Sequence, residues 1–329
     1  MKKTLAILLS AVLSLGVLTA CGNKDAEEKK ENAENTAFKI GVLQLVEHPS
    51  LNLAYEGFVE GLKENGLVDG ENIKIDFQNA SGDQTNCISI ADKLVNGGSD
   101  LILAIATPAA QAVASKTSTV PVLCTAVTDF EAAKLIEKNI SGTSDMAPVE
   151  NEMKLIRELF PEAKTVAMLY SSSEANSKLQ VDMAKEACKA LGLEAVDKTV
   201  SNTNDLNQIV QSLQGKCDVI WVPTDNTVVS GMATVTMIAT ELGIPVVASE
   251  ENSVQNGALA AHSLDYFELG KQTAVQAAKI LKDGVSPNEL PVEFLKETRL
   301  CYNGKTAQAL GLELSEEFLA KAEDLNENK

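Results

Sequence analysis

The amino-acid sequence predicts an α/β fold with two doubly wound lobes. Short runs rich in Val, Ile and Leu alternate with amphipathic helical patterns, which is typical of βαβ units and of parallel sheets buried on both faces. Glycine follows most of these helical patterns, as expected at a helix C-terminus. The alternation runs twice, over about 38–145 and about 147–261, so each run predicts one lobe.

The first run contains four strand patterns and two helical patterns that end at glycine. The strands are Lys39–Val46, Ile73–Gln78, Leu101–Ala106 and Val120–Ala126, and the helices are Leu51–Asn65 before Gly66 and Thr85–Asn96 before Gly97. Thr107-Pro108 predicts one more helix start, with Thr107 as the N-cap and proline as the first helical residue.

The second run repeats this order of strands and helices. Its strands are Thr165–Tyr170, Glu194–Val200, Val219–Val222 and Ile244–Ala248, and its helices are Asn176–Leu191 before Gly192, Asp205–Gln214 before Gly215 and Thr227–Leu242 before Gly243. A further strand and the long helix Tyr266–Lys282 are expected within 257–290. No strong sequence repeat links the two runs, so only the architecture is repeated.

The N-terminus has the pattern of a lipoprotein signal peptide over residues 1–20. Lys2 and Lys3 precede the apolar run Leu5–Val17, and the sequence L-T-A-C ends at Cys21, which would carry the lipid. The alternative is an ordinary signal peptide with an incidental cysteine, while a spanning helix would need roughly 20 apolar residues. Residues 21–37 predict a disordered tether. The expected location is the extracytoplasmic face of the cell membrane, reached through a lipid anchor on Cys21.

Composition excludes several classes of partner and site. The formal net charge of −18 argues against nucleic acid and anionic lipid headgroups as direct partners. Five cysteines besides Cys21 form no C-x-x-C pair, so neither a disulfide framework nor a zinc site is expected. The five are Cys87, Cys124, Cys188, Cys217 and Cys301. Most of them lie in apolar stretches and are expected in the core.

The loops after the predicted strands are rich in hydroxyls, amides and carboxylates, and contain no arginine or lysine. Ligands of doubly wound sheets bind beyond the carboxyl ends of the strands. Helix starts at Thr107 and after Ser171–Ser173 would offer N–H groups to a carboxylate, although Thr107 could be only a cap. Asp129, Asp225 and Glu250 end strands, and one of them could pair with an ammonium group; Asp225 could equally be only a cap. Together these groups suit an α-amino acid zwitterion.

Catalysis and metal binding are disfavoured. Only His48 and His262 are available, and neither a G-x-S-x-G elbow nor an H-E-x-x-H helix occurs. Because no nucleophile and base can be paired, we expect no catalytic residue. Two histidines and scattered acids are a weak metal signal, so no metal and no cofactor is expected.

Several segments resemble one protein family, the tryptophan/tyrosine-type ABC transporter substrate-binding lipoproteins. The resemblance runs from about Phe38 to Ala322 and depends on six segments. These are Ile40–Pro49, Ala104–Gln111, Thr125–Asp129, Ser173–Ser177, Val222–Ser230 and Leu264–Tyr266. The chain departs from the family pattern around Ala261-His262-Ser263, where a histidine beside the hinge would alter ligand choice.

This resemblance implies a type I periplasmic-binding-protein fold, in which two doubly wound, Rossmann-like lobes are joined by a three-crossing hinge. It implies lobe 1 at 38–145 plus about 264–292, and lobe 2 at 146–263 plus about 293–329. It also implies that the ligand, an aromatic amino acid in characterised relatives, passes to a permease. Lobe 1 would hold the ligand carboxylate near Thr107, Thr125 and Ala126, and lobe 2 would contribute Ser173, Asn176, Asp225 and Asn226.

The leading hypothesis is therefore a substrate-binding lipoprotein of an ABC importer for a neutral, aromatic amino acid. The candidate ligand-binding residues are Thr107, Thr125, Ala126, Asp129, Ser173, Asn176, Asp225, Asn226 and Glu250. One alternative is a nucleoside or sugar ligand, for which Phe130 and Tyr170 are the nearest aromatic residues for stacking. A second alternative is a sensor lobe for a membrane signalling partner, and a third is an exported enzyme.

Overall fold

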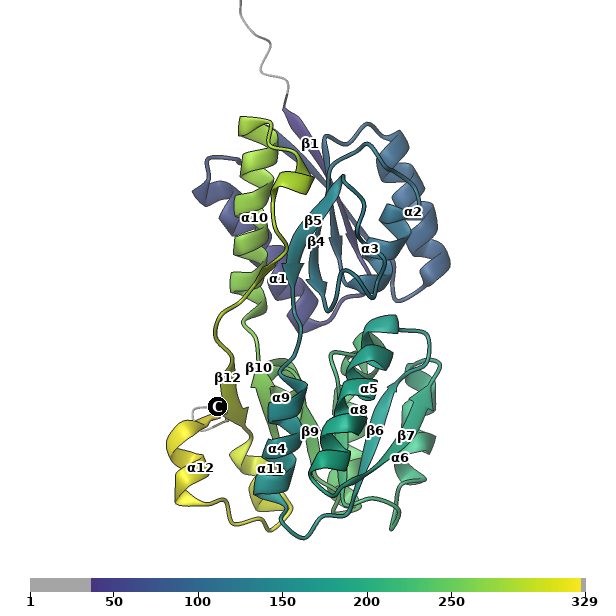
Figure 1. Ribbon diagram of the computed structural model, residues 1–329, viewed down its shortest axis with the longest axis vertical. Helices are drawn as coiled ribbons and strands as arrows, with labels where there is room; N and C mark the ends of the chain where they lie inside the picture. Colours follow the sequence, from purple (N-terminus) through teal and green to yellow (C-terminus); the bar gives the residue numbers. More distant parts are fainter. Residues whose placement is uncertain (1–36, 327–329) are drawn as a thin grey trace, which may run out of the picture. The chain divides into compact units, whose positions relative to one another are not determined.

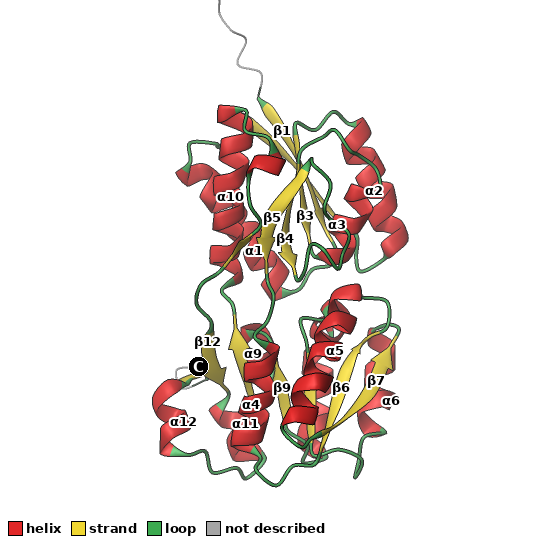
Figure 2. Ribbon diagram, in the orientation of Figure 1, coloured by secondary structure: helices red, strands yellow, loops and turns green. Residues whose placement is uncertain are grey.

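A computed structural model describes residues 37–326 and contains two sheets, each with helices on both faces (Figures 1 and 2). The predicted signal peptide at 1–20, the lipidation of Cys21 and the tether up to residue 36 lie outside the described residues. Among residues 37–326, no helix combines the length and the apolar character that a membrane span requires.

The first sheet is parallel throughout, in the order β11-β5-β4-β3-β1-β2. Its strands are β1 (Phe38–Gln44), β2 (Ile73–Asn79), β3 (Leu101–Ile105), β4 (Val122–Val127), β5 (Ile140–Ser144) and β11 (Glu293–Phe294). The helices around it are α1 (Pro49–Glu64), α2 (Gln84–Asn96), α3 (Thr107–Ala114) and α10 (Tyr266–Asp283), followed by the 3₁₀ turn η2 (Pro287–Glu289).

The second sheet has the order β13-β12-β10-β9-β8-β6-β7, and only the β10–β12 pair is antiparallel. Its strands are β6 (Thr165–Ser171), β7 (Glu194–Val200), β8 (Val219–Val222), β9 (Val246–Ala248), β10 (Ala260–Ser263), β12 (Arg299–Tyr302) and β13 (Glu323–Asp324). Its helices are α4 (Val149–Leu159), α5 (Ala175–Ala190), α6 (Leu206–Gln211), α7 (Asn226–Ser230), α8 (Met232–Glu241), α9 (Glu251–Gln255), α11 (Gly304–Ala309) and α12 (Glu316–Lys321), with the 3₁₀ turn η1 (Thr203–Asp205).

Both sheets share one strand order, which confirms the predicted doubly wound fold. The order is β2-β1-β3-β4-β5 in the first sheet and β7-β6-β8-β9-β10 in the second, and it reverses beside β1 and beside β6. The chain passes from one sheet to the other three times, at 145–148, 264–265 and 295–298, and these connections can be followed in Figure 1. β11 pairs with β5, so the first sheet takes strand residues beyond 292, where we predicted lobe 1 to end. The lobe boundaries themselves stay a prediction.

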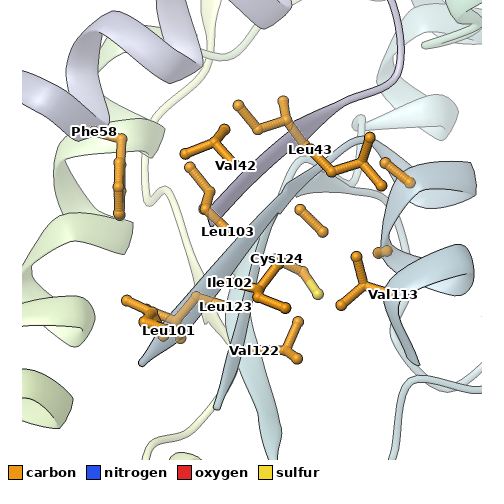
Figure 3. Packing of buried hydrophobic residues seen from close by; sticks show 14 of the residues in the cluster. Val42, Leu43, Phe58, Leu101, Ile102, Leu103, Val113, Val122, Leu123 and Cys124 are labelled. Atoms are coloured by element: carbon orange, nitrogen blue, oxygen red, sulfur yellow. The ribbon is translucent and has the colours of Figure 1, made fainter. Parts of the chain in front are cut away.

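The central strands of the first sheet are buried at every position, as their continuous apolar sequences predict. Figure 3 shows Phe58 of α1 and Val113 of α3 on opposite sides of the strands that carry Leu103 and Leu123. All four side chains have no exposed surface. Full burial of one such side chain stabilises the fold by about 1.5–3 kcal/mol. Packing of helices on both faces therefore stabilises this sheet.

Two predicted helix boundaries are wrong, for local reasons. Thr107 is not the N-cap of α3, because Ala106 occupies that position with φ 81° and ψ 151° and Thr107 lies inside the helix. The predicted helix Thr227–Leu242 is divided at Gly231 into α7 and α8. A Cβ atom at Gly231 would lie 2.2 Å from Leu206 Cδ1, so a larger residue here would displace the Leu206 side chain at the start of α6.

The cysteines occupy the positions that the sequence predicts. In the described part of the chain all five are free, Cys217 is half-buried and the other four are buried. Burial raises the pKa of each thiol above its usual value. These residues therefore act as small core side chains, and Cys188, for example, lies 3.3 Å from the sulfur of Met153.

Candidate functional site

The strand order places the candidate site between the two sheets. In doubly wound sheets, ligands bind outside the carboxyl ends of the strands where the strand order reverses. Here those ends belong to β1 and β3 in the first sheet and to β6 and β8 in the second. The loops that follow them meet, because His48 Nε2 lies 3.2 Å from Asn226 Oδ1. Close by, Ser50 Oγ donates a hydrogen bond of 2.6 Å to Glu250 Oε2.

A narrow cavity of about 10 Å³ lies within this contact, and we call it the inter-lobe cavity. It is far smaller than the roughly 300–1,000 Å³ that is usual for small-molecule sites, so it must widen to admit a ligand of that size. It is lined by His48, Leu51, Ala126, Asp145 and Tyr266 on one side and by Asn176, Thr224, Asp225, Asn226, Val229 and Glu250 on the other. A groove of about 390 Å³ shares Asn226 with the cavity and includes Val46, Pro108, Ser173, Glu174 and Thr227.

Three carboxylates line the inter-lobe cavity, and its described lining contains no lysine or arginine. Asp225 accepts hydrogen bonds from Ser171 N at 2.6 Å and from Val228 N at 2.8 Å. It therefore caps α7, as the predicted alternative held, and also lines the cavity. Asp145 accepts hydrogen bonds from Thr128 Oγ1 at 3.1 Å and from the Tyr266 hydroxyl at 3.0 Å.

Burial makes these carboxylates unusually weak acids. It raises the pKa of Asp145 to about 6 and that of Glu250 to about 7. The pKa of Asp225 is raised by burial and by the neighbouring carboxylate of Glu174. Clustered carboxylates that are removed from water are stabilised by a positively charged group. The inter-lobe cavity is thus suited to a cationic part of a ligand.

Two further buried side-chain oxygens, Thr107 Oγ1 and Asn176 Oδ1, lack a hydrogen-bond partner among the described residues. Both residues line a small pocket of about 10 Å³, and Asn176 lines the inter-lobe cavity as well. Thr107 lies in the first turn of α3, where free N–H groups favour an anion.

The structure separates the nine predicted ligand-binding residues into groups. Five of them line the inter-lobe cavity, namely Ala126, Asn176, Asp225, Asn226 and Glu250. Ser173 lines the groove, and Thr107 and Asp129 line the small pocket. Asp129 Oδ1 also accepts a hydrogen bond from Ala132 N. Thr125 is not among the described lining residues; its hydroxyl lies 3.0 Å from that of Thr143 inside the first lobe.

Several lining residues were not predicted from the sequence. His48 and Glu174 lie in strand-end loops, but nothing in those loops distinguishes them from neighbouring polar residues. Asp145 follows β5, a strand that the sequence did not predict. Tyr266 begins α10, which follows the second passage between the sheets.

Aromatic and histidine side chains that we considered for the site lie elsewhere. Phe130 and Tyr170 are buried in the hydrophobic cores of the two lobes. His262 lies on β10 opposite Leu300 of β12 and is not among the described lining residues of the cavity; the expectation that it alters ligand choice stays a prediction. Within residues 37–326, no group of three or more His, Cys, Asp or Glu side chains is placed to hold a metal ion.

Comparison with known proteins gives consistent findings. Residues 39–326 match the family described as ABC transporter substrate binding protein. The tyrosine-binding protein of Clostridioides difficile (strain R20291) is 42% identical over 322 residues, which cover 95% of this chain and 93% of that protein.

Two solved structures resemble this one closely in sequence. A domain from Streptococcus pneumoniae in complex with L-Trp is 40% identical, with a TM-score of 0.84 over 87% of this chain and 99% of that chain. The ligand-free, open structure of a substrate binding protein with adhesive properties from Clostridium difficile is 44% identical, with a TM-score of 0.67 over 88% and 99%. At similar identity, the structure described here is therefore more like the complex than the open form.

Proposed function

Because this chain belongs to the family of ABC transporter substrate-binding proteins, we propose that it binds tyrosine or tryptophan in the inter-lobe cavity and delivers it to the permease of an ABC importer. Members of this family bind small molecules and work with ABC permeases; they are not enzymes. The observation that carries the proposal is a buried cavity with three carboxylates and no cation in its described lining. Two relatives support it: one is named a tyrosine-binding protein, and the other was solved in complex with L-Trp.

The ligand ammonium group is proposed to lie between Asp225 and Glu250. These residues follow β8 and β9, which are neighbours in the second sheet, so their carboxylates reach the same part of the cavity. Their raised pKa values have burial as the leading cause. A charge-assisted hydrogen bond to an ammonium group would favour the ionised forms.

The ligand carboxylate is proposed to be held without arginine. Arg157 donates to the carbonyls of Pro161, Ala163 and Leu191, and Arg299 pairs with Glu251 and Glu323. Instead, the hydroxyl of Thr107 and backbone N–H groups at Ala126 and the start of α3 are suitable neutral donors. Neutral donors suit a single carboxylate, whereas dicarboxylates and phosphates would call for arginine.

The proposal includes a location. The sequence L-T-A-C before and at Cys21 supports a lipid anchor at the extracytoplasmic face of the membrane, where a substrate-binding protein meets its permease. Binding would favour the closed arrangement of the lobes, because a ligand between them contacts both lobes only when they close.

Isothermal titration of the purified protein, unfolded and refolded to remove carried-over ligand, tests the proposal. We expect one-to-one binding of tyrosine or tryptophan and no binding of the analogue that lacks the ammonium group, 3-(4-hydroxyphenyl)propionate or indole-3-propionate. Asp225→Asn and Glu250→Gln should each weaken binding of the amino acid more than about tenfold, because a buried ammonium loses an ionic partner.

The matched control is Asp218→Asn. Asp218 likewise accepts from two backbone N–H groups, those of Lys164 and Thr165, but it precedes β8, whereas Asp225 follows it, and it lies outside the cavity lining. This variant should bind as the unchanged protein does. Folded protein that ignores aromatic amino acids and binds a nucleoside or sugar would overturn the proposal.

A further inference from the structure

A chain of three side chains fixes the orientation of one amide at the cavity. Glu174 Oε2 accepts hydrogen bonds from Asn226 Nδ2 at 2.6 Å and from Asn226 N at 3.2 Å. Its other oxygen accepts from Thr227 N at 3.0 Å and from Thr227 Oγ1 at 2.9 Å. Because each Glu174 oxygen already accepts from a backbone N–H group, the side chain acts as an acceptor here, and the NH₂ group of Asn226 must face Glu174. Its amide oxygen must then face the opposite way.

That amide oxygen decides where His48 carries its hydrogen. Asn226 Oδ1 lies 3.2 Å from His48 Nε2, and an amide oxygen only accepts, so Nε2 is the nitrogen that bears hydrogen. Burial lowers the pKa of His48 to about 4, so the ring is neutral at pH 7 and has a single N–H. Nδ1 therefore carries no hydrogen and can only accept a hydrogen bond.

No described residue donates a hydrogen bond to Nδ1 of His48. His48 is 6% exposed and lines the inter-lobe cavity. Leaving a buried acceptor without a hydrogen-bond partner destabilises the ligand-free protein. A ligand with a correctly placed N–H or O–H would recover that stability.

The neighbours of His48 indicate which part of the ligand meets it. Leu51, one helical turn along α1, and Val229 of α7 supply aliphatic surface to the same cavity. An apolar ring would lie against them. The ammonium group has three carboxylates as stronger acceptors, which leaves the neutral Nδ1 for a donor on the ligand side chain.

We propose that His48 is a specificity-determining residue, whose Nδ1 accepts a hydrogen bond from the phenol O–H of tyrosine or the indole N–H of tryptophan and so selects against aromatic side chains without a donor. The inference rests on the proposed function and deepens it. A site built around a hydrogen bond rejects ligands that lack the donor, because its buried polar group is then left unpaired.

Two variants separate the two ring nitrogens. In His48→Gln the amide nitrogen takes the place of Nε2, so the bond to Asn226 is kept and the acceptor is lost. In His48→Asn the amide oxygen takes the place of Nδ1, so the acceptor is kept and the bond to Asn226 is lost. Thermal unfolding first shows that both variants are folded. Isothermal titration then compares tyrosine with phenylalanine, and tryptophan with 3-benzothienylalanine, in which sulfur replaces the N–H.

We expect the unchanged protein to prefer the donor-bearing member of at least one pair by about tenfold or more. His48→Gln should remove that preference and change binding of the donor-free member less than about threefold, while His48→Asn should retain the preference. An unchanged protein that binds both members equally overturns the inference but leaves the proposed function standing. So does equal weakening of both members in His48→Gln, which would mean a merely structural role. If no aromatic amino acid binds, both proposals fail.

Discussion

Ala106, directly after strand β3, has a backbone conformation that only glycine adopts without strain. Its φ of 81° and ψ of 151° lie in a region that is essentially reserved for glycine. Ala126, at the end of β4, has φ 54°. The two strained residues stand on neighbouring strand ends, beside Thr107 and at the inter-lobe cavity. Such strain persists only where the surrounding structure imposes it, and it clusters at functional sites.

Ala106→Gly should therefore stabilise the protein. Relief of the strain, about 1–3 kcal/mol, exceeds the roughly 0.4–1 kcal/mol that glycine's freedom in the unfolded chain costs. We expect the free energy of unfolding in urea to rise by about 1 kcal/mol. Ala104→Gly, two residues earlier, within β3 and similarly buried, should lower it. A fall for Ala106→Gly as well would show that the backbone here is not strained.

Residue roles were harder to predict than residue positions. The sequence places polar groups at the strand ends, and most of the candidates do line the cavity, the groove or the small pocket. It could not show that Ala106 would displace Thr107 from the cap position. Nor could it show that His48 would meet Asn226, because that contact joins residues from different sheets. Only the paired geometry of Glu174, Asn226 and His48 assigns a hydrogen to one ring nitrogen.

Helices α1 and α10 are separated by 200 residues of sequence but pack at glycine contacts. A Cβ atom at Gly57 would lie 2.0 Å from Phe267 O, and one at Gly270 would lie 2.0 Å from Ala54 O. Both distances are to backbone atoms, which cannot rotate away. The first lobe thus depends on glycine on both sides of this helix pair.

Gly270→Ala should force the two helices apart. Overpacking of a core usually costs about 1–3 kcal/mol, and sometimes more, and a backbone clash gives little room to relax. We expect the free energy of unfolding to fall by at least that amount. Val275→Ala on the same helix is a suitable control, because Val275 is 42% exposed, and it should change stability by less than about 0.5 kcal/mol. Equal effects would mean that the helices are not in close contact.

Strands with an apolar sequence of their own were predictable, and strands that depend on neighbours were not. β8 matches its predicted bounds, because its sequence VIWV is a short apolar run after a helix stop. β7 matches its predicted bounds as well, although its sequence EAVDKTV mixes charged and β-branched residues. β5 was missed since its sequence, ISGTS, is polar and contains Gly142. β11 and β13 are two residues long. Such strands form because an adjacent strand offers its free backbone groups, which no local pattern reveals.

At the scale of the whole molecule, buried carboxyl groups couple stability to pH. Burial raises the pKa of Glu152 to about 8 and that of Glu250 to about 7. Unfolded, such groups ionise near pH 4.5, so between that pH and 8 the folded protein holds protons that the unfolded chain has lost. Stability from these groups is fully present below pH 4.5 and is lost as the pH rises through 8.

We therefore expect the free energy of unfolding in urea to fall between pH 6.5 and pH 8.5, a window above the usual pKa of histidine. Glu152→Gln should make this fall smaller, because glutamine can still accept from Trp221 Nε1 and Ser249 Oγ but has no proton to lose. Glu241→Gln, which removes an exposed carboxyl group, should leave it unchanged. Stability that rises over this window would contradict the assignment.

The three passages between the sheets also set the order in which the protein can be completed during synthesis. When residue 263 leaves the ribosome, strands β1–β5 are present, but α10 and β11 are not. Helix α1 then lacks the helix that packs against it. The second sheet waits in turn for β12 at 299–302. A nascent chain therefore exposes apolar surface from both lobes until its last segments emerge. Chaperones can bind this surface until translation is nearly finished.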